Sequence, residues 1–250
     1  VNISDLSYDG DVKPSSEKGI HASCYSLRPD CNFVIHTHQK NASVVSALGV
    51  DINSVNGGSA DIIGNDVPCA SYGLPGTGKL RKGVVDALNR SKSKAVIMAH
   101  HGAVCLGSDY NEAFAVANEL EKVCEEYIID RCKSISGKAC ETFSDVVDYV
   151  SGVFTSDEKY KPAKEFEACD SERKDDCFYI APEGKAASVI DIKSGAWVGG
   201  AEIPDSADMH LAIYKKRGDV NYIRHSKNEF AVAASRKGKT LKPFLDDFAQ

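Results

Sequence analysis

Three absences narrow the class of this 250-residue chain before any motif is considered. No apolar stretch approaches the length of a membrane span, and Val1 does not open a signal peptide, so we expect a cytoplasmic protein without membrane contacts. There is no excess of positive charge, and a net charge of -6 argues against a nucleic-acid-binding protein. No C-x-x-C pair occurs among the nine cysteines, whose odd number and scatter indicate reduced thiols rather than a disulfide framework.

The remaining composition, 26% charged and 42% hydrophobic, is that of an ordinary globular protein with enough chain for one or two domains. Short apolar runs alternate with segments of helical spacing, which predicts an α/β fold. Strands are expected at 32–38, near 67 and at 94–99, and helices from 15 or 16 to 27, at 42–48, 80–89 and 109–130. Residues 50–64 are expected to be irregular.

Histidines cluster at the ends of two apolar runs. His36 and His38 close the first run, and residues two apart on a strand point to the same face. Two imidazoles therefore leave the strand side by side, a geometry that suits one divalent metal ion. His100 and His101 end the second run, so four of the seven histidines lie at strand ends. We therefore favour a metal site over two chance clusters.

The sequence contains an internal repeat: the C-terminal part of the chain repeats a pattern from the N-terminal part at a fixed offset of 189 residues, the distance from His21 to His210. The aligned identities include His21 and His210, Tyr25 and Tyr214, Arg28 and Arg217, Asp30 and Asp219, Asn32 and Asn221, and His36 and His225. The offset is close to the size of one domain, which predicts a tandem domain rather than a solenoid. His38 aligns with Lys227 and Glu17 with Ser206, so we expect the second copy to have lost the metal.

The ordered motifs of the first copy resemble the class II (metal-dependent) aldolase/adducin family. They are Pro14-Ser15-Ser16-Glu17, His21, Tyr25, Arg28-Pro29-Asp30, His36-Thr37-His38 and His100-His101-Gly102. The resemblance implies a layered α/β/α domain with a central mostly antiparallel or mixed sheet, partly duplicated. We expect a family domain at 1–135 that lacks its N-terminal elements, a linker with some helix at 136–176, and a partial degenerate second copy at 177–250.

The resemblance also implies a ligand set. A single divalent metal, usually zinc, would be held by His36, His38 and His101, with His100 beside them in a structural role. Glu17 matches the family's acid/base residue, the alternative being an exposed first-turn glutamate favoured by the helix dipole. Ser15 and Ser16 match residues that help hold a substrate phosphate, the alternative being plain helix capping.

This site predicts a lyase that performs retro-aldol cleavage of a small sugar phosphate or related hydroxy-carbonyl compound through a metal-stabilised enediolate. A carboxylate at Glu17 would move the proton. The alternatives are a non-catalytic adducin-like scaffold, or an epimerase, dehydratase or decarboxylase of the same family. By analogy with family aldolases we expect a homo-oligomer, either a tetramer or, for a tandem chain, a dimer.

The chain departs from the family pattern in two places. Family members have N-terminal elements ahead of the Pro-Ser-Ser-Glu segment that the first copy lacks, and one hypothesis is that residues 178–250 supply them. The fuculose-phosphate aldolase branch uses a tyrosine after the H-x-H helix, whereas no tyrosine lies between Tyr25 and Tyr72, which leaves the proton donor unassigned.

The glycine-rich segment 73–78 lacks the Lys-Ser or Lys-Thr of a P-loop and predicts a turn before a helix.

Overall fold

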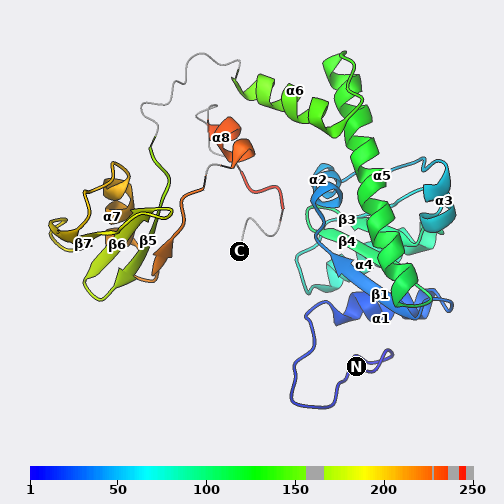
Figure 1. Cartoon of the computed structure of the whole chain (residues 1–250). Helices are drawn as coiled ribbons and strands as arrows, with labels where there is room; N and C mark the ends of the chain where they lie inside the picture. The colour runs from blue at the N-terminus through cyan, green and yellow to red at the C-terminus, as the bar shows by residue number, and fades with distance from the viewer. Residues whose placement is uncertain (156–165, 227, 236–241, 246–250) are drawn as a thin grey trace. The chain divides into compact units, whose positions relative to one another are not determined.

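The computed structural model describes residues 1–155, 166–226, 228–235 and 242–245, and the chain divides into two compact units (Figure 1). The first unit is Val1–Tyr149 with Leu241–Gln250, and the second is Val150–Thr240. Among the described residues, no helix combines the length and the apolar character needed to cross a membrane.

A mixed four-stranded sheet forms the centre of the first unit. Its order is β1 (Phe33–Thr37), β4 (Gly102–Gly107), β3 (Ala95–Met98) and β2 (Cys69–Ala70). The β1–β4 and β4–β3 pairs are antiparallel, and the β3–β2 pair is parallel. Every residue of β3 and β4 is buried, as expected for strands that are covered on both faces. The predicted α/β class with a mixed sheet is confirmed.

Helices cover both faces of this sheet. On one face lie α1 (Lys18–Leu27) and α4 (Gly78–Arg90). On the other lie α2 (Lys40–Leu48), α3 (Gly58–Ile63) and α5 (Tyr110–Ser136). The first unit is therefore a three-layer α/β/α domain, as predicted.

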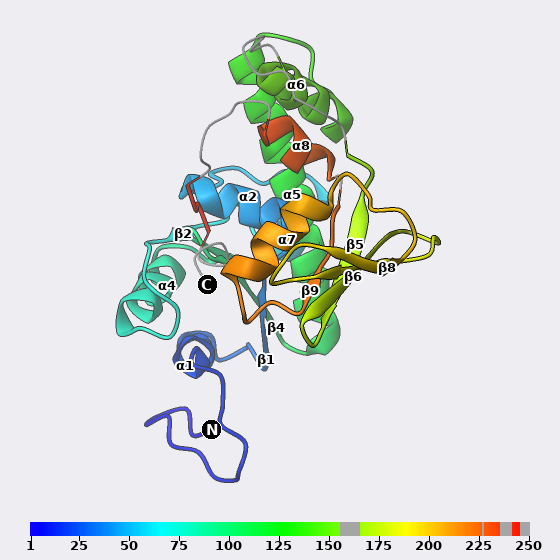
Figure 2. The same ribbon diagram turned by 90° about the vertical axis from the view of Figure 1, so that its left-hand side faces the viewer.

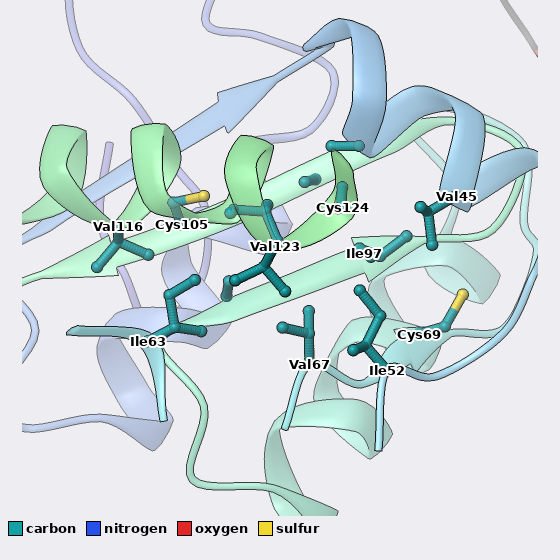
Figure 3. Packing of buried hydrophobic residues seen from close by; sticks show 14 of the residues in the cluster. Val45, Ile52, Ile63, Val67, Cys69, Ile97, Cys105, Val116, Val123 and Cys124 are labelled. Atoms are coloured by element: carbon teal, nitrogen blue, oxygen red, sulfur yellow. The ribbon is translucent and has the colours of Figure 1, made fainter. Parts of the chain in front are cut away.

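The two hydrophobic cores are supplied by alternate residues of the same strands. In β3, Ile97 packs with Val123 and Cys124 of α5, and Figure 3 shows these side chains between the helix and the sheet. The next residue, Met98, belongs to the opposite cluster with Leu80 of α4. This alternation follows from the two-residue period of a strand.

Side-chain caps set the starts of two helices. Asp109 Oδ1 accepts a hydrogen bond from the Glu112 N–H at 2.9 Å and caps α5 at the start of the helix predicted for 109–130. Thr77 Oγ1 accepts from the Leu80 N–H at 3.4 Å and caps α4. The glycine-rich segment 73–78 is therefore a turn before a helix, and that prediction is confirmed.

Two helices differ from the sequence prediction. The short helix α3 forms within 50–64, which was expected to be irregular. Helix α5 continues to Ser136, beyond the predicted end at 130, because Cys132 packs against Cys140 and Val146 in a small separate cluster. Val146 belongs to α6 (Phe143–Thr155), which lies within the segment 136–176 that was expected to contain some helix.

The second unit contains an antiparallel sheet. Its order is β8 (Trp197–Gly200), β7 (Ser188–Asp191), β6 (Cys177–Pro182), β5 (Cys169–Lys174) and β9 (Tyr222–Ile223). Among the described residues, no strand of this sheet pairs with the sheet of the first unit, and the hypothesis that 178–250 completes the first copy stays a prediction.

One helix packs against the sheet of the second unit. Helix α7 (Ala207–Lys216) places Ala207 and Tyr214 in a core with Phe178 of β6, and Figure 2 shows the helix beside the strands. Helix α8 (Glu229–Ser235) follows β9. Strand β5 lies in the segment that the sequence assigned to a linker, and Lys227, the counterpart of His38, lies outside the described residues.

Candidate metal centre

Strand β1 delivers two imidazoles to one place. His36 lies within β1 and His38 just beyond its end. Their rings are stacked, with centroids 4.8 Å apart and an interplanar angle of 19°. The two Nε2 atoms are 2.8 Å apart. The side-by-side arrangement expected from the H-x-H spacing is therefore present.

The turn between β3 and β4 delivers a third imidazole. His100 takes a left-handed conformation with φ 61, and its N–H donates to the Ser46 carbonyl at 2.9 Å. The ring of His101 then lies with its centroid 4.9 Å from those of His36 and His38. His100 itself contacts Tyr72, 5.6 Å away between ring centroids, and is not part of the three-histidine group.

A glycine allows this turn to approach β1. A Cβ atom at Gly102 would lie 2.5 Å from the Thr37 carbonyl oxygen and 3.1 Å from Cδ2 of His38. Real Cβ atoms essentially never come so close to backbone, so only glycine fits without a shift of the strand. The sequence pattern marks this residue through His101-Gly102, but its steric role becomes visible only in the structure.

Glu17 joins the histidines from the start of α1. Its Oε2 lies 2.6 Å from Nδ1 of His36, and its Oε1 lies 3.1 Å from Nε2 of His101. The residue is 8% exposed, so the alternative of an exposed first-turn glutamate does not describe it. Burial alone would raise the pKa of this carboxyl, but hydrogen bonds from His101 and His36 outweigh it and hold the pKa well below its usual value.

The residues present fit a divalent transition metal. One ligand atom from each of His36, His38 and His101 lies within 4.8 Å of the others. Three imidazoles with a nearby carboxylate form a nitrogen-rich donor set of the kind that zinc prefers. A carboxylate that accepts from Nδ1 of His36 fixes that ring and turns its Nε2 toward His38, which is how ligating histidines are commonly oriented.

The two predicted phosphate-binding serines lie directly before this carboxylate. Ser15 Oγ accepts a hydrogen bond from the Glu17 N–H at 3.1 Å, as plain capping would require. Ser16 and Glu17 line a cavity of about 300 Å³, and its other wall includes Gly76, Thr77 and Arg81. The Arg81 side chain is held in place because its Nε donates a hydrogen bond to Ser23 Oγ at 2.8 Å. The sequence did not indicate that the 73–78 turn forms part of this wall. Gly76 permits its close approach to Ser16, because a Cβ atom at Gly76 would lie 3.0 Å from the Ser16 Cβ.

Comparison with known proteins defines the class. The family model for the Class II Aldolase and Adducin N-terminal domain matches residues 1–128 and 172–250, so the chain belongs to this family. An L-fuculose phosphate aldolase of Escherichia coli is 35% identical over 115 residues, which are 46% of this chain and 53% of the relative. A 5-methylthioribulose-1-phosphate/5-deoxyribulose-1-phosphate aldolase of Rhodospirillum rubrum is 34% identical over 127 residues, 51% of this chain and 56% of the relative.

A solved structure of an L-fuculose 1-phosphate aldolase is 25% identical, has a TM-score of 0.46, and is matched over 57% of this chain and 64% of its own length. The chain therefore spans about half the length of the curated relatives that it matches.

Proposed function

We propose that the first unit is a divalent-metal-dependent lyase that performs retro-aldol cleavage of a small sugar phosphate or a related hydroxy-carbonyl compound. The observation that carries this proposal is the convergence of His36, His38 and His101 with the buried carboxylate of Glu17. The curated relatives at 34–35% identity are sugar-phosphate aldolases, which supports the same class of reaction.

In this proposal the three histidines hold the cation, which supplies Lewis-acid stabilisation of the enediolate when bound. Glu17 lies against two of the histidine rings and is the carboxylate placed to move the proton of the substrate. Its burial also keeps water away from the proton that it moves. Gly102 holds the His101 turn against β1, so the ligand set is built before substrate arrives.

We assign substrate phosphate to the cavity beside Ser16. Two helix starts face it, those of α1 at Lys18 and α4 at Gly78, and Lys18 and Arg81 supply positive charge. The alternative of a non-catalytic scaffold requires no metal, and the epimerase, dehydratase and decarboxylase alternatives use the same ligand set. Among these, a lyase agrees best with the curated relatives' reaction class. The homo-oligomer stays an expectation by analogy with family aldolases.

We also propose that residues 177–250 are a partial, degenerate second copy, separated by a segment at 136–176 from a first domain at 1–135. The offset of the sequence repeat recurs in the structure: α1 is Lys18–Leu27 and α7 is Ala207–Lys216. The last turns of both helices also match, since the N–H of Arg28 bonds the Cys24 carbonyl as that of Arg217 bonds Ile213.

Zinc stoichiometry tests the proposed function. Wild-type protein is expected to hold about one zinc per chain, and His36→Ala is expected to lose it. His225→Ala is the matched control, because His225 is the counterpart of His36 in the second copy. Retro-aldol cleavage of a panel of phosphorylated ketoses should then follow the metal content. A folded wild-type protein that binds no divalent cation would contradict the proposal.

A further inference from the structure

Two cysteines meet where α5 ends and the chain continues toward α6. Cys132 lies near the end of α5, Cys140 lies in the segment between the two helices, and their sulfur atoms are 3.2 Å apart. The cysteines of this structure are all free thiols. Among the described residues, this pair has the sulfur–sulfur contact within hydrogen-bonding distance. These two thiols therefore differ from the scattered thiols that the sequence indicated.

A glycine turn brings the two cysteines together. Gly137 ends α5 in a left-handed conformation, with φ 64, and its N–H donates to the Lys133 carbonyl at 3.1 Å. Glycine adopts this conformation without the strain that a Cβ atom adds. The chain therefore reverses directly after the helix, and Cys140 returns to the side of α5 that carries Cys132.

Both sulfur atoms lie in a small apolar cluster. Cys132 is 7% exposed and Cys140 is 3% exposed, and Val146 of α6 completes the buried part of the cluster. Partly buried side chains pack against it, namely those of Ile128, Ile129 and Tyr149. Burial and the contact with Cys140 raise the pKa of the Cys132 thiol to about 11. The closed cluster therefore keeps Cys132 protonated.

A serine hydroxyl contacts the pair. Ser136 Oγ accepts a hydrogen bond from the Lys138 N–H at 3.1 Å, and it lies 3.8 Å from the sulfur atom of Cys140. The hydroxyl hydrogen is available to this sulfur atom, and such a hydrogen bond stabilises a thiolate. Cys140 also lies outside the helix, so it leaves the cluster without unwinding α5. Cys140 is therefore the thiol suited to react first.

The cluster is built to open locally. It is separate from the two cores that hold the sheet of the first unit, and Figure 1 shows the end of α5 extending beyond that sheet. Regions with few buried apolar contacts open at a lower free energy than the core. A small reagent therefore reaches these thiols without unfolding the first unit.

We propose that Cys132 and Cys140 are a reversible dithiol–disulfide pair that exchanges with a small disulfide of the glutathione type. The bond fastens the segment that leads into α6 to the end of α5. A disulfide bond is about 2 Å long, so the two sulfur atoms need to approach each other by about 1 Å. The proposal does not depend on the candidate metal centre.

The exchange proceeds in two steps that conserve atoms and electrons. The thiolate of Cys140 attacks one sulfur atom of the small disulfide, which forms a mixed disulfide and releases one small thiolate. The thiolate of Cys132 then attacks the sulfur atom of Cys140, forms the internal bond and releases the second small thiolate. Two electrons pass from the cysteine pair to the small disulfide, and the two thiol protons pass to the released thiolates.

Glutathione redox buffers test this pair in the full chain. The protein is equilibrated with oxidised and reduced glutathione at several ratios, free thiols are blocked, and the cysteines are mapped by mass spectrometry. Trypsin cleaves after Lys133 and Lys138, which lie between the two cysteines, so the internal bond joins two peptides that reductant separates. We expect this bond to exceed the mixed disulfides of Cys132 and Cys140 roughly tenfold or more.

The same equilibrium in urea separates native contact from closeness in sequence. Two cysteines eight residues apart pair to some extent in any flexible chain. If the native contact matters, the ratio of disulfide to dithiol should fall roughly tenfold or more when the protein is unfolded. In the folded chain, hydrogen exchange at the amides of Val146 and Tyr149 should slow on oxidation. An equal ratio in folded and unfolded protein overturns the proposal.

Variants of the turn supply a second test. Gly137→Ala is strained at positive φ and should lower the ratio of disulfide to dithiol roughly fivefold in the folded chain, whereas Gly137→Asn should restore most of it. Cys177→Ser is the control, because it removes a half-buried free thiol of the second unit and should leave the pair unchanged. The proposal is wrong if Cys132 and Cys140 form only mixed disulfides, or if both stay reduced while Cys177 is modified.

Discussion

Replacing Gly102 by alanine tests whether the β3–β4 turn holds the candidate metal ligands in place. The new Cβ would lie 2.5 Å from the Thr37 carbonyl and 3.1 Å from the His38 ring, so β4 must move away from β1 or the His38 ring must turn. Gly102 is a strand residue whose φ is not positive, so the backbone itself accepts alanine. The cost therefore comes from the close contact alone.

The magnitude follows from two opposing effects. Overpacking in a rigid region costs about 1–3 kcal/mol, and the lower chain entropy of alanine in the unfolded state returns about 0.4–1 kcal/mol. We expect a net loss of about 1–2 kcal/mol in the free energy of unfolding of the metal-free protein. Because His38 is displaced by several tenths of an ångström, zinc affinity should fall roughly 10–100-fold, the range for changes beside metal ligands.

Two measurements separate these effects: urea unfolding of the metal-free protein, and competition for zinc with a chelating dye. Gly58→Ala is the control, since a Cβ there meets nothing within 4 Å and the residue begins helix α3. Wild-type zinc affinity in the Gly102→Ala protein would refute the steric argument. A loss of stability without a loss of zinc would show that Gly102 supports the sheet but not the ligand set.

Three further predictions concern the frame around the site. Asp109→Ala removes the cap of α5 and should lower the free energy of unfolding by about 1 kcal/mol, measured by urea denaturation. Glu121→Ala should cost about 1.5–3 kcal/mol in the same assay, because its carboxylate accepts from the backbone N–H groups of Asn41 and Ala42 at the start of α2. Hydrogen bonds from Lys94 and Ser108 lower the pKa of Glu112 to about 2. The ionised carboxylate therefore stabilises the fold fully above its unfolded pKa of roughly 4.3, and this effect disappears as the pH falls toward 2. The difference in free energy of unfolding between wild type and Glu112→Ala should shrink over the same pH range.

The sequence predicts the parts of this fold that have a long period or a strict spacing. The long helix predicted for 109–130 is present as α5, which begins directly after its cap Asp109. The H-x-H spacing places two imidazoles together because the strand period alone fixes their direction. By contrast, Glu17 and His101 contact each other although they are far apart in sequence, and only the family resemblance indicated this contact.

Two elements were missed for identifiable reasons. Helix α3 has six residues and buries only Ile63, which is too short a pattern to show a helical period. Strand β5 reads Cys-Asp-Ser-Glu-Arg-Lys, and its charged composition resembles a linker. Its inward residues are nevertheless Cys169 and Ser171, and Arg173 satisfies its charge on backbone carbonyls of the same unit. Polar residues that bind backbone groups are therefore the hardest part of this fold to recognise from sequence.

The proposed second copy shows what the loss of one carboxylate leaves behind. Where Glu17 contacts His36, the counterparts are Ser206 and His225, and a serine side chain is shorter by two heavy-atom positions. In the described part of the chain, Oγ of Ser206, Nδ1 of His225 and Nε2 of His210 are buried without a hydrogen-bond partner. Each buried polar atom left unpaired costs about 1–3 kcal/mol, so stability alone does not explain these histidines. We propose that they descend from a copy that once carried the carboxylate, in keeping with the site proposed for the first unit.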